Sequence, residues 1–380
     1  MDEIWILGAT GRSGRAIATR LALANVPLTL VGRDSAGLDE LAGTLGGAPR
    51  TIVLDPAGAA RARAGGAGGA GAARRAVAGF AARIAAERPA VVVNTIGPFT
   101  ETAPVIARAC PPGTHYVDLA NELPAVTGLL GMHDEAVADG RCLVTGAGFG
   151  VLATESVVLA LCAGRPAPAR VRVDALAAVA NKPGRLGTAL AASIVDAVAV
   201  GGRRYERGRL VRARLAGDFE RFALPDDSTA HSASGPSGEL EAAHRASGAP
   251  WVVAASGAMP AGRAVRAVLP ATAVLLAWRP FGNAVKRRLA RVRVTAGERS
   301  REFSWARARV EDADGGVREG WLRAGEALDF TASAAAEVAA RLARSEGRPG
   351  AYTPGALFGP DLAVAAGGTL LVDGAAAGTS

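Results

Sequence analysis

The chain has 380 residues, which is enough for two domains that each bury a hydrophobic core. Its net charge is +8, but nearly all basic residues are arginines scattered through the chain, so we expect no nucleic-acid partner. The three cysteines, Cys110, Cys142 and Cys162, are too few for a disulfide framework and lack metal-site spacing. We therefore expect no metal and, since no signal peptide is evident, a cytoplasmic location.

The first predicted strand, residues 4–7, runs into a glycine-rich turn with the spacing G-x-x-G-x-x-G. Gly8 permits a sharp exit from the strand, Gly11 allows backbone N–H groups to approach a diphosphate, and Gly14 allows the next helix to pack closely. Because the start of a helix favours an anion, we predict a dinucleotide here, and the alternative is a turn without ligand. The residues predicted to bind it are Gly8, Thr10, Gly11, Arg12, Ser13 and Gly14.

A second apolar run, residues 26–31, is predicted as the next strand and ends in Gly32-Arg33. The residue at this position of a nucleotide-binding unit meets the adenosine ribose, and an arginine accommodates a 2′-phosphate. Arg33 therefore favours NADP over NAD, and Arg12 could supply a second charge to the same phosphate. The alternative is that Arg33 is a solvated loop arginine. The adjacent Asp34 weakens the distinction between NADP and NAD, because an acidic residue at this position binds the ribose 2′-hydroxyl of NAD.

Residues 35–45 follow as a predicted helix and residues 51–55 as a third strand. Asp55, at the end of that strand, is predicted to contact the adenine, or alternatively to cap the next helix. Residues 57–75 are almost wholly Ala, Gly and Arg, which indicates a variable loop before a helix at residues 77–87.

Three further apolar runs, residues 90–96, 115–119 and 142–145, complete a predicted doubly wound parallel sheet of the Rossmann type, with a helix at residues 103–109. Ligands of such sheets lie beyond the carboxyl ends of the strands. We therefore expect the segment after the fourth strand to line the cofactor. Its predicted contacts are Asn94, Thr95, Gly97 and Pro98.

The second half predicts an α+β domain with a largely antiparallel sheet. Its predicted strands are 171–176, 252–253, 291–295, 301–305 and 308–311, its helices 156–162, 186–200 and 333–344, and Asp314-Gly315 is a hairpin signal. We predict a nucleotide domain at 1–155, a substrate domain at 156–335, and a segment at 336–380 that returns toward the first domain.

Residues 264–278 form the longest apolar stretch, but Arg266 and Pro270 interrupt it, so it does not read as a transmembrane helix. We favour a core helix. The alternative is a contact with a membrane surface, with Trp278, Arg279 and the cluster 286–288 at the interface.

Five motifs follow one another along the chain: Gly8 to Gly14, Val31 to Arg33, Asn94 to Phe99, Thr114 to Asp118 and Gly146 to Gly150. Their order resembles that of the saccharopine dehydrogenase-like oxidoreductases and, among them, the trans-acting enoyl reductases. The similarity covers residues 1 to about 160 and returns weakly at 329–332 and 348–359. Two positions depart from the pattern. Gly150 stands where relatives commonly have an acidic residue, and Asn121-Glu122 replaces a Gly-Glu pair but keeps the carboxylate.

The chemistry expected of this arrangement is hydride transfer from NADPH, with the protein positioning the acceptor. Asp118, Glu122 and Tyr116 are the predicted catalytic residues, with capping or core roles as the alternatives. The resemblance implies reduction of an activated C=C bond in a small-molecule or acyl-thioester substrate. Reduction of a C=N bond and binding of NADPH without turnover are the other hypotheses, and a homodimer is left open.

Overall fold

The computed structural model describes residues 3–54, 79–179, 184–185, 188–260, 262–294 and 301–372, in two compact units. The first unit contains residues 1–120, 124–148 and 331–357, and the second contains 121–123, 149–330 and 358–380. The longest segment of the second unit runs from Phe149 to Phe330, and the chain returns to the first unit within a helix, at Thr331. Asp55, the loop at 57–75 and the start of the helix at 77–87 lie outside the described residues.

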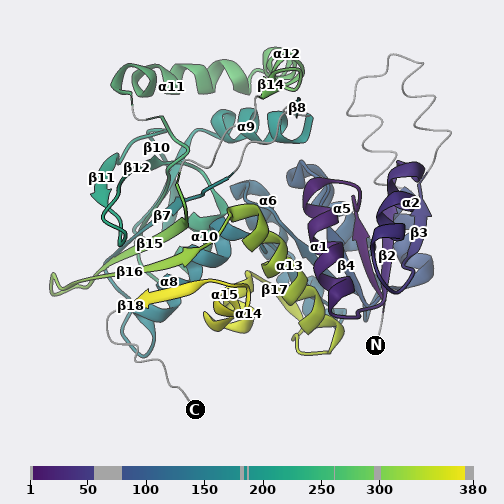
Figure 1. Cartoon of the computed structure of the whole chain (residues 1–380). Coiled ribbons are helices and arrows are strands. Elements are labelled where there is room, and N and C mark those ends of the chain that lie inside the picture. Colours follow the sequence, from purple (N-terminus) through teal and green to yellow (C-terminus); the bar gives the residue numbers. More distant parts are fainter. Residues whose placement is uncertain are drawn as a thin grey trace. The chain divides into compact units, whose positions relative to one another are not determined.

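The first unit contains a sheet of 7 parallel strands in the order β17-β6-β5-β4-β1-β2-β3, as predicted for a doubly wound fold (Figure 1). The strand order reverses between β1 and β4, which makes their carboxyl ends the topological switch point. The strands are β1 (Ile4–Leu7), β2 (Leu28–Gly32), β3 (Arg50–Val53), β4 (Val91–Asn94), β5 (His115–Asp118), β6 (Cys142–Val144) and β17 (Gly350–Tyr352).

Helices flank this sheet, and the burial of β1, β2 and β4 along their whole length fits strands that are covered on both faces. The late helix α13 lies beside α1 (Figure 1), where Arg20 Nε donates to Ser333 Oγ over 2.9 Å. The helices are α1 (Arg12–Leu23), α2 (Ser35–Thr44), one at 79–87, α5 (Phe99–Ala109), α6 (Leu123–Leu130), α7 (His133–Ala138), α13 (Ala327–Ala343) and α14 (Pro354–Phe358).

The second unit contains a sheet of 9 strands that is mixed and mostly antiparallel, as predicted. Only β13 and β7 pair in parallel among its described ladders. Its strands are β7 (Arg170–Leu176), β9 (Gly202–Glu206), β10 (Arg209–Ala213), β11 (Glu220–Ala223), β12 (Thr229–Ser234), β13 (Trp251–Ser256), β15 (Ser304–Glu311), β16 (Val317–Ala324) and β18 (Thr369–Val372), and β8 (Gly184–Arg185) pairs separately with β14 (Arg293–Val294).

Helices α8 (Thr154–Cys162) and α10 (Gly238–Ser247) pack together and against this sheet, and a π-helical turn, Phe149–Ala153, precedes α8. The short helix α15 (Asp361–Ala365) precedes β18. Outside the sheet, α11 (Arg263–Ala277) and α12 (Arg279–Leu289) pack on α9 (Thr188–Val200), at the top of Figure 1.

The two strands predicted at 301–305 and 308–311 are wrong, because β15 is one continuous strand from Ser304 to Glu311. The polar residue at the predicted break, Arg307, is buried between β7 and β16. Its guanidinium group lies 3.5 Å from Asp174, 3.2 Å from Glu220 and 2.5 Å from Glu319. A buried arginine with three carboxylate partners can occupy an interior strand position, so its polarity does not mark a strand end.

The prediction of a core helix at 264–278 is also wrong. Ala273 is the one buried residue among the described residues of α11, whereas Val274 is 73% exposed and Trp278, at its end, is 64% exposed. No single described helix has the length and apolarity to cross a membrane. Together α11 and residues 280–289 of α12 reach that length and composition, but with a bend of 109° between them.

Candidate functional site

The glycine turn of the first unit joins β1 to α1 at the switch point of the sheet. Gly8 has a φ of +80°, which L side chains rarely adopt, and a Cβ there would lie 2.8 Å from Thr95 Oγ1. At Gly14 a Cβ would lie 2.8 Å from the Cα of Ala9 and still closer to the carbonyl oxygen of Gly8. The backbone of the turn and the start of α1 are therefore packed as closely as the chain permits.

The start of α1 has the properties of an anion site. Gly11 is its N-cap and provides no side-chain cap, and no acidic residue lies in its first turn. The first N–H groups of a helix lack partners within the helix, and they carry the positive end of its dipole. Gly11 and Arg12 are exposed, while Thr10 and Ser13 are half-buried, so a diphosphate could approach this turn from solvent.

The loop after β2 lies next to this turn. A Cβ on Gly37, in the first turn of α2, would lie 3.2 Å from Cγ2 of Thr10. Asp34 is the N-cap of α2 and accepts a hydrogen bond from the N–H of Gly37 over 3.2 Å, so its carboxylate has a structural partner. Arg33 is exposed and forms no ion pair with any described residue, which leaves its guanidinium group available to a ligand.

The segment after β4 is fixed by a hydrogen bond to the end of β1 and by a hydrogen bond within the segment itself. Thr95 donates from Oγ1 to the carbonyl oxygen of Leu7 over 2.8 Å, which holds it against the end of β1. Asn94 is buried, and its Oδ1 accepts from the N–H of Ile96 over 3.0 Å. Gly97 and Pro98 are half-buried, and Pro98 is the N-cap of α5. The structure thus brings the turns at residues 8–14 and 94–98 together.

Two of the predicted catalytic residues belong to a buried chain of hydrogen bonds beneath that segment. Asn94 Nδ2 donates to the hydroxyl of Tyr116 over 3.0 Å, and this hydroxyl donates to Asp118 Oδ2 over 3.0 Å. The other oxygen of Asp118 accepts from Thr145 Oγ1 over 2.8 Å and from the N–H groups of Ala120 and Gly146. Tyr116 and Asp118 are 0% exposed. Their catalytic role stays a prediction, and the network itself favours positioning of the segment after β4.

Burial shifts the ionisation of this pair. It raises the pKa of the Asp118 carboxyl to about 6, although its hydrogen bonds to Ala120, Thr145, Gly146 and Tyr116 oppose the shift. Burial and the charge of Asp118 together raise the pKa of the Tyr116 hydroxyl well above its ordinary value. The hydroxyl therefore remains a hydrogen-bond donor at physiological pH.

The third predicted catalytic residue, Glu122, belongs to the second unit, where it forms a β-bridge with Ser237. Asn121, beside it, donates from Nδ2 to Glu239 Oε1 over 3.2 Å. Sequence reasoning missed Glu239, because no motif surrounds it. A Cβ on Gly150 would overlap Oε1 of Glu239 and lie 3.1 Å from its Cδ. The carboxyl of Glu239 thus occupies the space of the absent side chain at position 150.

Glu239 has the features of a functional carboxyl. It is 4% exposed, and burial raises its pKa, against the hydrogen bonds from Ser237 and Asn121. Its Oε2 is buried with no hydrogen-bond partner among the described residues. Such a group costs about 1–3 kcal/mol and calls for an explanation such as a ligand or a catalytic role. No group of three or more potential metal ligands occurs among the residues that the structure describes.

No protein-family model matches the sequence, and no curated protein matches it. Apo saccharopine dehydrogenase (L-Glu forming) from Saccharomyces cerevisiae is similar in structure, with a TM-score of 0.57 and 12% identity over 96% of each chain. Two matches cover 38% of this chain at a TM-score of 0.29. They are serine dehydrogenase from Escherichia coli, 15% identical over 80% of that chain, and a short-chain dehydrogenase from Sphingobium yanoikuyae in complex with NADPH, 17% identical over 71% of that chain. The chain therefore has a saccharopine dehydrogenase-like fold, and the assignment to the enoyl reductase branch stays a prediction.

The pH dependence of stability tests the buried state of Asp118. Because the folded-state pKa is about 6 and the ordinary value is 3.8, the folded chain keeps a proton between these values that the unfolded chain has lost. The stabilisation of the folded state that this proton provides is complete below about pH 4 and is lost as the pH rises through 6. From pH 7 to pH 5 the free energy of unfolding should therefore rise by about 1 kcal/mol more in the wild type than in Asp118→Asn. Urea denaturation at both pH values measures it, and identical pH dependence in the two proteins would contradict it.

Proposed function

We propose that this protein is an NADPH-dependent reductase. The observation that carries the proposal is the close packing of an uncapped helix start against the end of β1, at the switch point of a doubly wound sheet. This is the arrangement that binds the diphosphate of a dinucleotide. Residues 8–14 would hold the diphosphate, Arg33 the 2′-phosphate, and residues 94–98 the nicotinamide half. When bound, NADPH supplies a hydride.

Replacing Arg33 with alanine tests the choice of cofactor. An ionic hydrogen bond of this kind contributes about 1.5–3 kcal/mol, so the Kd for NADPH should rise by roughly 10- to 100-fold, while the Kd for NADH changes by less than about 2-fold. Fluorescence titration measures both constants. Arg108→Ala is the matched control, because Arg108 is another exposed arginine of the first unit, on α5. Equal weakening of NADPH and NADH binding in Arg33→Ala would remove the case for the 2′-phosphate.

For the substrate, we propose an activated C=C bond, such as that of an enoyl thioester. The support is the resemblance of the sequence motifs to the trans-acting enoyl reductases. The structural similarity to yeast saccharopine dehydrogenase favours a second candidate, the reduction of a C=N bond. In both reactions the acceptor carbon receives a hydride, and the atom at the other end of the double bond receives a proton.

A substrate comparison separates these candidates. We expect the protein to oxidise NADPH in the presence of an enoyl thioester and not in the presence of a keto acid with an amine, as followed by absorbance of the reduced nicotinamide. The reverse pattern would favour the C=N reductase. Tight binding of NADPH without oxidation by either class of acceptor would favour a binding protein that does not turn it over.

We propose that Glu239 supplies the proton. Its carboxyl contacts Asn121, three residues after the end of β5, and Gly150, which lies beyond β6. Its other oxygen, Oε2, is buried and has no hydrogen-bond partner among the described residues, so a group of the substrate could bind it. A raised pKa keeps a carboxyl protonated closer to physiological pH, which a general acid requires.

Glu239→Gln should lower kcat by about 100-fold or more, since proton transfer typically contributes that much. In the wild type, kcat should fall as the pH rises through the raised pKa of Glu239, and the variant should lose this dependence. Glu241→Gln is the matched control, because Glu241 is a buried acid of the same helix whose partners are Tyr205 and Arg245. An unchanged pH profile in Glu239→Gln would contradict the assignment, whatever its effect on stability.

A further inference from the structure

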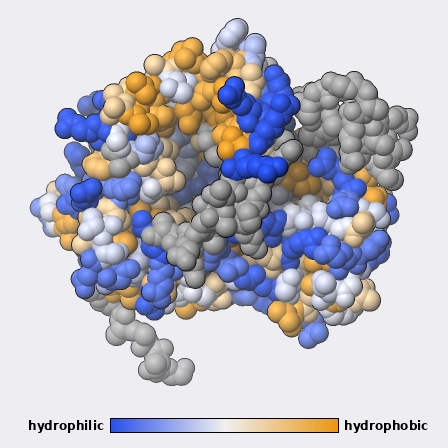
Figure 2. Space-filling view, turned by 45° about the horizontal axis from the view of Figure 1, so that its top comes forward, coloured by the Kyte–Doolittle hydropathy of each residue, from blue (hydrophilic) through white to orange (hydrophobic). Residues whose placement is uncertain are grey.

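The outer face of α11 is apolar, and its large side chains are exposed in the part of the chain that the structure describes. Between Arg266 and Arg279 the sequence contains no charged residue. The large side chains on this face are Val265 (50% exposed), Val268 (60%), Val274 (73%), Leu275 (56%), Trp278 (64%) and, on α12, Phe281 (40%). Figure 2 shows a hydrophobic patch over this part of the surface. A concentration of this kind is unusual on a monomer and indicates a surface that contacts something apolar.

The two helices of this face carry charged side chains of one sign only, and one of them, Lys286, forms an ion pair with Asp196 of α9 over 2.6 Å. Residues 262–294 contain basic side chains and no Asp or Glu. Arg287, Arg288 and Arg291 are exposed, and Figure 2 shows hydrophilic surface directly beside the hydrophobic patch. The basic residues are Arg263, Arg266, Arg279, Lys286, Arg287, Arg288, Arg291 and Arg293. The occupant must therefore be apolar and carry negative charge.

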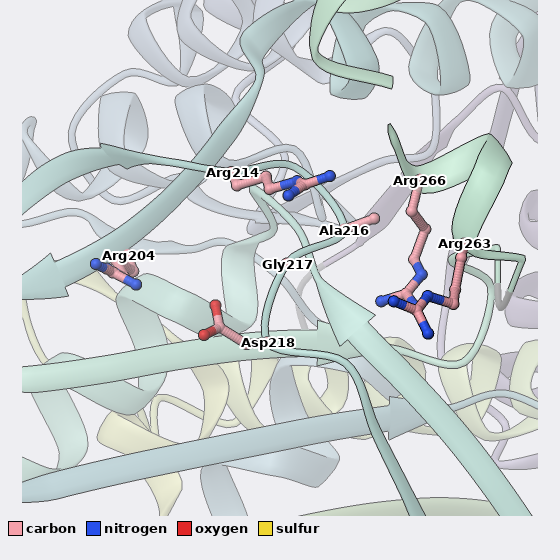
Figure 3. Close-up of a pocket in the computed structure, with 7 residues that line it drawn as sticks. All are labelled: Arg204, Arg214, Ala216, Gly217, Asp218, Arg263 and Arg266. Carbon is pink, nitrogen blue, oxygen red and sulfur yellow. The ribbon is translucent and has the colours of Figure 1, made fainter. Parts of the chain in front are cut away.

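A basic pocket lies at the start of the same helix (Figure 3). It has a volume of about 450 Å³ and is lined by Arg204, Arg214, Arg263 and Arg266, with Asp218 as its one acidic residue. Arg263 and Arg266 belong to the first turn of α11, whose N-terminus has no side-chain cap. Cations at the positive end of a helix dipole are unfavourable, and a bound anion such as a phosphate would relieve the repulsion.

We propose that the face formed by α11 and α12 docks on a bilayer that contains anionic phospholipid. An amphipathic helix lies in the interface with its apolar side inserted by about 5–10 Å, and neighbouring basic residues add attraction to anionic lipid. A second copy of the chain is the weaker candidate, because two such faces would bring their positive charges together. The bend between α11 and α12 suits a helix pair that lies in the interface.

Binding of the full chain to vesicles tests this inference. At low salt, the protein should co-float with vesicles of phosphatidylcholine containing 30% phosphatidylglycerol and bind at least about tenfold more weakly to phosphatidylcholine alone. Trp278, the most exposed tryptophan of the five, should shift its emission to the blue on binding, and Trp278→Ala should lose the shift. Inorganic phosphate at the same concentration should cause no such shift.

Variants separate the apolar and the electrostatic components of binding to the vesicles. Val274→Asp with Leu275→Asp, and Arg287→Glu with Arg288→Glu, should each weaken binding to anionic vesicles by about tenfold or more. The matched controls are Leu23→Asp, at a residue 79% exposed at the end of α1, and Arg209→Glu with Arg309→Glu, at two exposed arginines of the second sheet.

Three results would overturn the proposal. The first is no binding to either kind of vesicle by the wild type. The second is equal loss of binding in the face variants and in the controls. The third is a dimer in solution that Val274→Asp with Leu275→Asp dissociates, because that result would assign the face to a second copy of the chain. None of these measurements depends on reductase activity, so the proposed function can fail or hold independently.

Discussion

The first turn of α1 can lie against the end of β1 only because residue 14 has no side chain. A Cβ at Gly14 would approach Cα of Ala9 to 2.8 Å, and one at Gly8 would approach Thr95 to the same distance. The two glycines therefore set the position of the helix dipole and its first N–H groups relative to the sheet. Every functional assignment in the first unit depends on that contact, because it creates an anion site at the switch point between β1 and β4.

The turn at residues 94–98, next to the glycine turn, is held in place by buried polar groups. Asn94, Tyr116, Asp118 and Thr145 link the ends of β4, β5 and β6 through hydrogen bonds of 2.8–3.0 Å. Satisfied polar networks in a core specify one arrangement, because each member loses a partner if another moves. The carboxyl edge of the sheet thus combines an open helix start with a rigid segment after β4. This combination suits a cofactor that must be bound tightly at one end and oriented at the other.

The parallel sheet could be predicted because its strands are continuous apolar runs and its glycine turn has a physical cause. Other features could not be. Strand β17 has only three residues and joins the sheet from the far end of the sequence, so no local sequence pattern predicts it. Arg307 is a polar residue that lies buried among carboxylates. Its polarity led to the prediction of two strands where the structure has the single strand β15. The apolar run at 264–278 shows no periodicity that tells a core helix from an exposed one. Glu239 acquires its setting from Asn121 and Gly150, which are distant in sequence.

The most direct test of the central claim is the thermal stability of the intact chain with NADPH, measured together with the fluorescence of the bound cofactor. A ligand at 100 times its Kd stabilises the folded state by about 2.7 kcal/mol. We therefore expect the melting temperature to rise by several degrees and the nicotinamide emission to change with the same saturation curve. An unchanged melting temperature and unchanged emission at saturating NADPH would show that the glycine turn does not bind this cofactor.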